Sequence, residues 1–202
     1  DVSSVTDMSW MFEDASAFNQ DLNAWNTSNV VYLSGMFYNA QSFNGAIGNW
    51  DVSNATDIDN MFGNDTLFNQ DIGSWDVSNV QYAYWMFWNA SSFDQDIGNW
   101  DLSNCEDTWG MFAGASSFNQ DIGGWDMSKN EWFGYMFNQA SSFNQDIGGW
   151  DVSSAQIAWG YNPMESMFLD ATVFDQDLTA WCVTNIPSAP SDFSTNSALA
   201  AN

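Results

Sequence analysis

At residues 143–153 the chain reads Phe143-Asn144-Gln145-Asp146-Ile147-Gly148-Gly149-Trp150-Asp151-Val152-Ser153, a phrase that recurs almost letter for letter along the sequence. The tryptophan of this phrase recurs every 25 positions, at Trp25, Trp50, Trp75, Trp100, Trp125 and Trp150. Trp181 follows 31 positions later. A fixed period of this length is typical of stacked supersecondary units, each of which buries its apolar side against its neighbours. The repetition therefore predicts a repeat solenoid.

Each repeat carries a Met-Phe pair and a second Phe six places after the first, as at Met111, Phe112 and Phe118. With Ala115 between them, these residues have helical spacing, which predicts one short helical turn per repeat. The phrase Ile-x-x-Trp-x-Val follows, and its Trp-Asp-Val core alternates with period two. This alternation predicts one short strand with Trp and Val inward and Asp outward, so that stacking forms a parallel sheet.

The repeats also predict the domain limits. Residues 1–186 contain about seven repeats of 25 residues, with a six-residue insertion at 159–164 that we expect to bulge from the surface. Residues 187–202 lack the apolar phrases and are rich in Pro, Ser, Ala and Asn, which predicts a C-terminal cap or linker. The chain opens in mid-repeat at Asp1, so we expect a processed product or a piece of a longer protein.

The full repeat, Met-Phe-x-x-Ala-x-x-Phe-Asn-Gln-Asp-Ile-Gly-x-Trp-Asp-Val-Ser-Asn-Val, resembles the surface-protein repeat of Listeria and Mycoplasma lipoproteins, which is related to BspA-type leucine-rich repeats. The resemblance covers essentially the whole chain. Its Ile-x-x-Trp-x-Val core is similar to the Leu-x-x-Leu-x-Leu strand of a leucine-rich repeat. It implies a leucine-rich-repeat-like coil, which we expect to be right-handed, in secreted, surface-displayed and often adhesive proteins, and it brings no enzymatic activity.

Two cysteines are present, Cys105 and Cys182. Cys105 lies in an apolar column of the repeat and Cys182 lies three repeats further on, so at roughly 4.8 Å per coil they are too far apart to pair. We expect Cys105 to be a core residue and Cys182 to be a candidate for a disulfide with a partner outside this sequence. The stretch from Trp181 to Pro187 resembles the C-terminal cap of marine Bacteroidetes members, in which a second Cys follows downstream; no Cys follows here.

The net charge of the chain limits the classes of partner that it can bind. Lys129 is the only Lys or Arg against 26 acids, and the formal net charge is −25. Such a chain repels nucleic acid and anionic membrane surfaces, whereas cations, carbohydrates and basic proteins fit. No stretch approaches about 18 consecutive apolar residues, so we expect no membrane insertion. With 45% hydrophobic and 17% aromatic residues, the chain has enough apolar material to fold.

An enzyme is not expected. The chain has no His, which excludes a His-based triad, and its two separated cysteines exclude a Cys-rich metal site. Glycoside hydrolysis by two acids is the remote alternative.

The acids form columns along the repeats. One outward column contains Asp51, Asp76, Asp101, Asp126 and Asp151, and another contains Asp71, Asp96, Asp121 and Asp146. Carboxylates at roughly 4.8 Å spacing repel one another, and a Ca²⁺ ion about 2.4 Å from each oxygen would fit between two of them. No cofactor is required, and two interpretations are open: a Ca²⁺-binding column, or a solvated face whose Asp side chains bind turn amides.

Aromatic residues outside the repeated column form a candidate contact surface for a partner or a glycan: Trp10, Tyr32, Trp85, Trp88, Trp109, Trp132, Tyr135 and Trp159. Amphipathic rings suit sugar stacking or a subunit interface, and the alternative is that they lie flat on their own solenoid. Four Asn-x-Ser/Thr sequons are candidate glycosylation sites: Asn26, Asn54, Asn64 and Asn89.

Together these features predict a non-enzymatic structural or adhesive repeat module at the cell surface or outside the cell. Two forms of this function are open: a filament or coat subunit that self-associates or stacks on neighbouring repeats of a parent protein, and an adhesin domain that binds carbohydrate or a host protein. Filament formation requires an end-to-end contact that does not close on itself.

Overall fold

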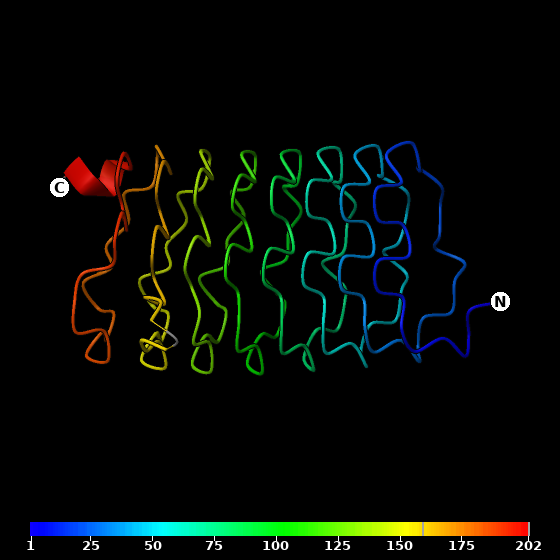
Figure 1. The fold of residues 1–202 in the computed structure, drawn as a ribbon, viewed down its shortest axis with the longest axis horizontal. Helices are drawn as coiled ribbons and strands as arrows, with labels where there is room; N and C mark the ends of the chain where they lie inside the picture. The colour runs from blue at the N-terminus through cyan, green and yellow to red at the C-terminus, as the bar shows by residue number, and fades with distance from the viewer. Residues whose placement is uncertain (159, 202) are drawn as a thin grey trace.

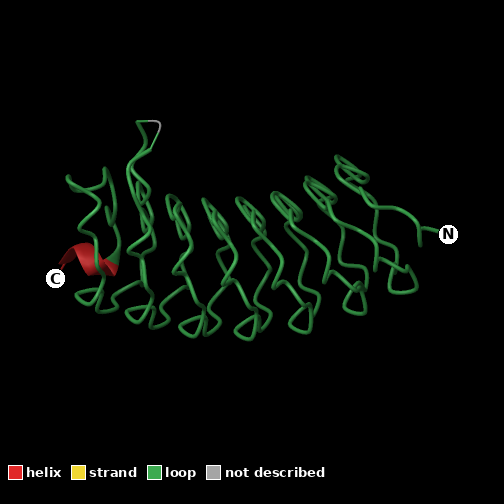
Figure 2. Ribbon diagram, turned by 90° about the horizontal axis from the view of Figure 1, so that it is seen from below, coloured by secondary structure: helices red, strands yellow, loops and turns green. Residues whose placement is uncertain are grey.

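The computed structural model describes residues 1–158 and 160–201, the last two by their backbone alone. The chain winds into a row of coils that lie side by side, with the two termini at opposite ends of the row (Figure 1). The same row is seen from below, gently curved (Figure 2). The prediction of a repeat fold is therefore confirmed.

Regular secondary structure is scarce among the described residues. The one helix is η1, a 3₁₀-helix at Ala198–Ala201. The strand expected at Trp-Asp-Val does not form, and the parallel bridges lie in another column of the repeat: Asp7–Tyr32, Tyr32–Asp57, Asp57–Tyr82, Tyr82–Asp107 and Asp107–Trp132. The prediction of a strand at Trp-Asp-Val was wrong.

The backbone amides around Trp-Asp-Val explain this correction. The amide N–H of Ser53 donates to Oδ1 of Asp51 (3.1 Å), and that of Trp50 donates to the carbonyl of Ile47 (3.1 Å). These amides are satisfied inside their own coil, so they cannot pair with the next one. An Asp followed by Ser two residues later competes with a strand ladder even where the apolar pattern favours one.

The predicted helical turn is replaced by a run of β-turns, which we call the turn strip; it covers residues 32–40 and the equivalent residues of the other coils. The amide N–H of Phe37 donates to the carbonyl of Met61 in the next coil (2.9 Å), whereas that of Tyr38 donates back to the carbonyl of Gly35 (2.9 Å). This alternation continues along the strip, so half of the amides close turns and half join coils. A helix would use all of them within one coil.

The turn strip needs left-handed residues at fixed places. Gly35 and Asn39 have φ values of 58° and 59°, and the equivalent positions of other coils repeat this conformation. Positive φ at the third residue of a four-residue turn is the signature of a type II turn, for which Gly and Asn are favoured. The turn sequence thus sets the coil geometry at its outer edge.

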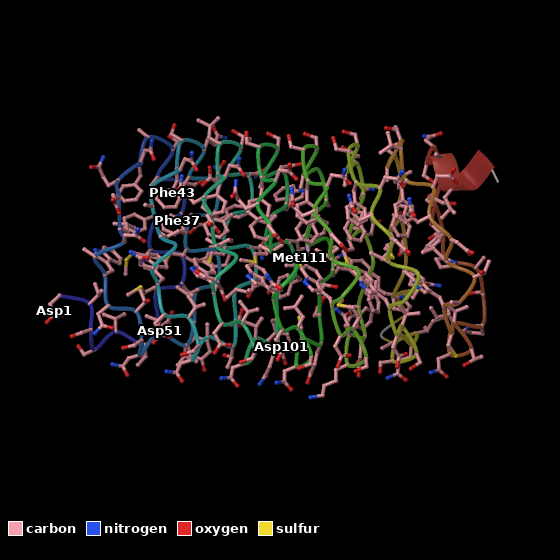
Figure 3. The ribbon with its side chains drawn as sticks, turned by 180° about the vertical axis from the view of Figure 1, so that it is seen from behind. Asp1, Phe37, Phe43, Asp51, Asp101 and Met111 are labelled. Carbon is pink, nitrogen blue, oxygen red and sulfur yellow. The ribbon has the colours of Figure 1, made fainter. Side chains whose placement is uncertain are left out.

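The core consists of rings stacked from coil to coil. Phe37 packs on Phe43 within one coil (centroids 3.9 Å apart) and on Phe62 of the next (5.8 Å), while Trp50 stacks on Trp75 (6.3 Å). Trp50, Trp75, Trp100, Trp125 and Trp150 are each at most 4% exposed, which confirms that this column points inward. Phe37 and Phe43 lie together inside the coils, away from the edge that carries Asp51 and Asp101 (Figure 3).

Side-chain ladders replace the missing strand. Trp50 Nε1 donates to the carbonyl of Leu22 in the preceding coil (2.9 Å), and this bond recurs up to Trp181. On another edge the amide N–H of Asn69 donates to Oδ1 of Asn44 (2.9 Å), and Gln70 Nε2 reaches the same oxygen (3.0 Å). The recurring Phe-Asn-Gln phrase therefore builds a polar ladder that joins the coils.

The insertion leaves the stack in register. The amide N–H of Phe137 donates to the carbonyl of Met167 (2.9 Å), so the ladder advances by 30 residues at this step instead of 24. The segment around the insertion projects from the row (Figure 2), and Ala158 and Tyr161 form an antiparallel bridge there. Beyond it, Phe168 donates to the carbonyl of Phe193 (2.8 Å), so residues near 193 add a further strip to the last coil.

Candidate binding face

The exposed side of the turn strip carries a continuous chain of rings, which we call the aromatic face. Seven of the described aromatic side chains make it up: Trp10, Tyr38, Trp88, Trp85, Tyr135, Trp109 and Trp132. Neighbouring rings in this order have centroids between 5.4 and 6.3 Å apart. The structure therefore brings together six of the eight residues expected on a contact surface and adds Tyr38.

Glycines in the neighbouring coils make room for these rings. A Cβ atom at Gly35 would lie 2.2 Å from the Trp10 ring, and one at Gly110 would lie 2.3 Å from the Trp85 ring. Trp10 and Trp85 themselves have positive φ (60° and 55°), an uncommon conformation for a bulky residue. Each ring thus leans over a glycine of the next coil, and local backbone strain is accepted to place it there.

The rings are only partly covered. Trp10 is 44% exposed, and the others are half-buried. The alternative that the rings lie flat on their own solenoid is therefore partly correct, since one side of each ring packs on the coils and the rest remains accessible.

One coil contributes no ring to the aromatic face. Asn60 stands 25 positions before Trp85, and Gly63 stands 25 positions before Trp88, so that coil offers no ring at either place. The result is a cavity of about 300 Å³ lined by Asn60, Trp85 and Trp88. Across Gly63, Tyr38 and Trp88 meet in a stacked pair (6.3 Å). The cavity lies within the aromatic face.

Carboxyl groups lie beside the cavity. Ser34 Oγ is 2.7 Å from Oδ1 of Asp57 and 2.8 Å from Oδ1 of Asp59, and Asn60 Nδ2 donates to Oδ2 of Asp59 (3.1 Å). A hydroxyl has one proton to donate, so one of the two short contacts to Ser34 requires a proton on a carboxyl group. Burial and the neighbouring Asp59 raise the pKa of Asp57 to about 6, in agreement with a shared proton.

Two further groups on the turn strip, Asp107 and Tyr84, have raised pKa values. Burial raises the pKa of Asp107 to about 6, and the amide of Trp109 offsets part of that increase. Burial and the hydrogen bond with Asp59 raise the pKa of Tyr84, so its phenol remains protonated. The turn strip therefore carries two carboxyl groups, those of Asp57 and Asp107, with pKa values of about 6.

The carboxylates of the two predicted Asp columns accept hydrogen bonds within local turns. Asp51, Asp101, Asp126 and Asp151 accept hydrogen bonds from the serine two residues on, whose hydroxyl and amide lower their pKa. Asp71, Asp96, Asp121 and Asp146 accept from the glycine amide two residues on. In the part of the chain that the structure describes, no group of three or more His, Cys, Asp or Glu is arranged to hold a metal ion. The Ca²⁺ interpretation stays a prediction.

The remaining described residues singled out in the sequence do not belong to the aromatic face. Tyr32 is 47% exposed and joins the bridge column between Asp7 and Asp57, and Trp159 lies outside the described residues. Cys105 is buried and Cys182 is exposed, both with free thiols.

The four sequons lie in ladders and turns. Asn54 Nδ2 donates to the carbonyl of Ser28 (2.7 Å), and Asn89 Nδ2 donates to Oδ1 of Asn64 (3.0 Å). Asn26 accepts from Ser28. A glycan on Asn54 or Asn89 would be attached to the nitrogen atom that makes a coil-to-coil hydrogen bond.

Sequence reasoning missed three features. Asn60 and Asp59 were available as departures from the repeat, since no other coil places an Asn at the position of Asn60 or an Asp at the position of Asp59. Asp65 was available in the same way, because it replaces the alanine found at Ala40 and Ala90. A residue-by-residue comparison of equivalent positions would have found all three.

Comparison with known proteins identifies one family. The pattern of the family described as "Mycoplasma protein of unknown function, DUF285" matches the chain four times, over residues 1–70, 33–115, 65–160 and 95–202. No curated protein and no solved structure matches. Among the described residues, no helix has the length and apolar character needed to cross a membrane.

Proposed function

We propose, since the chain belongs to this Mycoplasma-type repeat family, that it is a non-enzymatic structural or adhesive module of the cell exterior. We further propose that its coil is a right-handed relative of the leucine-rich-repeat coil in which turns and side-chain ladders replace the strand. Adhesion through the aromatic face is the form of this function that we favour.

The aromatic face is the observation that carries this proposal. Its rings run along the row of coils and are partly exposed. The chain is strongly acidic, with only one Lys or Arg, so a strip of exposed aromatic rings differs in character from its charged surface. Tyr and Trp side chains supply large, rigid contact areas and are enriched in protein interfaces. The rings also match the apolar faces of sugars. A carbohydrate or a host protein surface is therefore the proposed partner class.

The experiment compares binding by wild-type protein and a variant with Trp88→Ser and Trp109→Ser on a glycan array and on host cells. The matched control is Leu67→Ser with Val173→Ser, because these residues are 53% and 43% exposed and stand outside the ring chain. We expect the tryptophan variant to lose most binding and the control to retain it. Equal binding by both variants would exclude the aromatic face as the contact surface.

The filament alternative makes a different prediction. A coat or filament subunit would form larger species as concentration rises, whereas an adhesin domain would stay monomeric. Sedimentation velocity over a hundredfold concentration range separates the two functions, and a concentration-dependent series would replace adhesion by assembly as the proposed function.

A further inference from the structure

We propose that the cavity lined by Asn60, Trp85 and Trp88 binds an organic cation of the trimethylammonium type. This goes beyond the proposed function, since it requires only this one cavity and makes no use of an adhesive role.

The two indoles give the cavity its character. Their ring centroids are 5.8 Å apart and their planes meet at 72°, so the cavity of about 300 Å³ has two aromatic walls set nearly at right angles. A cation within about 6 Å of an aromatic face is attracted by the ring quadrupole, and Trp is the strongest of the aromatic side chains in this role. A compact cation in this corner would contact both walls at once.

Asn60 supplies the third wall and a link to negative charge. Its Nδ2 donates to Oδ2 of Asp59, which turns its Oδ1 away from that carboxyl group. Asp59 is 3% exposed and does not line the cavity, so its carboxyl group reaches the cavity only through the hydrogen bond with Asn60. A cation in the cavity would be attracted by this group through Asn60 without displacing its hydrogen bonds.

Charge selects the class of ligand. The chain carries a formal charge of −25, and its single basic residue, Lys129, bonds Asn104 on another edge of the coils. An anion would meet repulsion from every side, and a neutral sugar would gain nothing from the charge. A hard metal cation needs several oxygen ligands, which two indoles do not supply. A quaternary ammonium group combines positive charge with an apolar surface and matches both properties.

The test uses isothermal titration calorimetry at constant ionic strength, with choline as the probe and 3,3-dimethylbutan-1-ol as its neutral counterpart of the same shape. We expect choline to bind at least tenfold more tightly. Phosphocholine, which adds a phosphate, distinguishes a lipid-type headgroup from a free quaternary amine and should bind more weakly than choline. Tighter binding by phosphocholine would contradict the charge argument.

Variants locate the site. Trp88→Leu should weaken choline binding at least tenfold, whereas Leu67→Ser, at an exposed residue outside the ring chain, should leave it unchanged. Should Trp88→Leu fail to fold, Asn60→Tyr provides a second variant, because its ring would meet Trp85 and would thus occupy the cavity, whereas the Trp10 and Trp85 rings meet a glycine of the next coil. We expect Asn60→Tyr to abolish binding.

Three results would overturn the inference: equal affinity for choline and the neutral alcohol, tighter binding of a neutral monosaccharide than of choline, or choline binding that survives Asn60→Tyr in a folded protein. Failure of the wild-type protein to bind choline, with its glycan or host-cell binding intact, would refute the cation site alone. The reverse result would refute only the adhesive function.

Discussion

Replacing Asp65 by alanine should stabilise the protein at neutral pH. Asp65 occupies the column that holds Ala40 and Ala90 in the adjacent coils, and all three residues are fully buried. Neither carboxyl oxygen of Asp65 has a hydrogen-bond partner of good geometry, although the amides of Leu67 and Phe68 lie close enough to the carboxyl group to influence its pKa. A buried carboxyl group without partners is costly, and the repeat itself shows that alanine fits this position.

The pKa of Asp65 sets the sign of the pH dependence. Burial raises it from 3.8 to about 8, and the amides of Leu67 and Phe68 offset part of the increase. Because the folded pKa lies above the unfolded one, the contribution of Asp65 to stability is fully present below about pH 4. It is lost as pH rises towards 8.

The magnitude follows from the shift. One pKa unit corresponds to about 1.36 kcal/mol, so at pH 7 the buried carboxyl group costs roughly 3–5 kcal/mol relative to low pH. The small cavity left by Asp65→Ala offsets about 1 kcal/mol of the gain. We therefore expect the variant to be about 2–4 kcal/mol more stable than wild type at pH 7.

Urea denaturation of wild type and Asp65→Ala at pH 4, 6 and 8 measures this difference. The gain should grow with pH across the series and nearly vanish at pH 4. Asp65→Asn provides a matched control, because it removes the charge but keeps the side-chain size and a buried polar group. A variant that is less stable than wild type at pH 7, or a difference independent of pH, would refute the reasoning.

Three further predictions concern the stack. Trp100→Ala should cost about 3–5 kcal/mol in thermal denaturation, because it empties a buried column and removes the bond from Nε1 to the carbonyl of Ile72; a loss below about 1 kcal/mol would contradict the inward column. Gly73→Ala should cost about 1–3 kcal/mol, since its Cβ would lie 2.3 Å from the carbonyl oxygen of Asp96, whereas Gly124→Ala, with open space around it, is the control and should cost less. If Ca²⁺ binds the Asp columns, millimolar CaCl₂ should raise the melting temperature more than NaCl at equal ionic strength, and identical curves would exclude a specific site.

The repeat period predicted the parts of the fold that depend on which residues are equivalent. The burial of Trp100 and Phe118 followed from their columns, because an apolar residue repeated in every coil must face the shared core. The strand at Trp-Asp-Val failed because the pattern recorded apolar alternation but not the competing bond from the Ser103 amide to Asp101. The same bond engages Asp101, a member of the column that the sequence offers as a cation site, and the Ca²⁺ interpretation of that column stays a prediction.

The sequence could predict most of the residues that belong to the aromatic face but not how their rings come together. Sequence indicated that Trp85, Trp88 and Tyr135 lie outside the core, yet their convergence depends on the direction in which each ring leans. That direction is set by a left-handed backbone at Trp85 and by Gly110 in the next coil. The cavity forms because Asn60 is smaller than Trp85, the residue at the equivalent position of the next coil. Departures from a repeat locate a site better than the repeat does.

The two classes of carboxyl group in this chain act on stability in opposite directions. Asp101 and Asp126 have lowered pKa values because serine hydroxyl and amide groups bind them, so their contribution is present above about pH 4 and lost as pH falls below it. Asp57 and Asp107 have raised pKa values of about 6, so their contribution declines as pH rises from 4 towards 6, as that of Asp65 does towards 8. Repulsion among the remaining acids also grows with pH. Stability of the wild-type stack should therefore be greatest in weak acid, and the pH 4 point is the baseline from which the cost of Asp65 is measured.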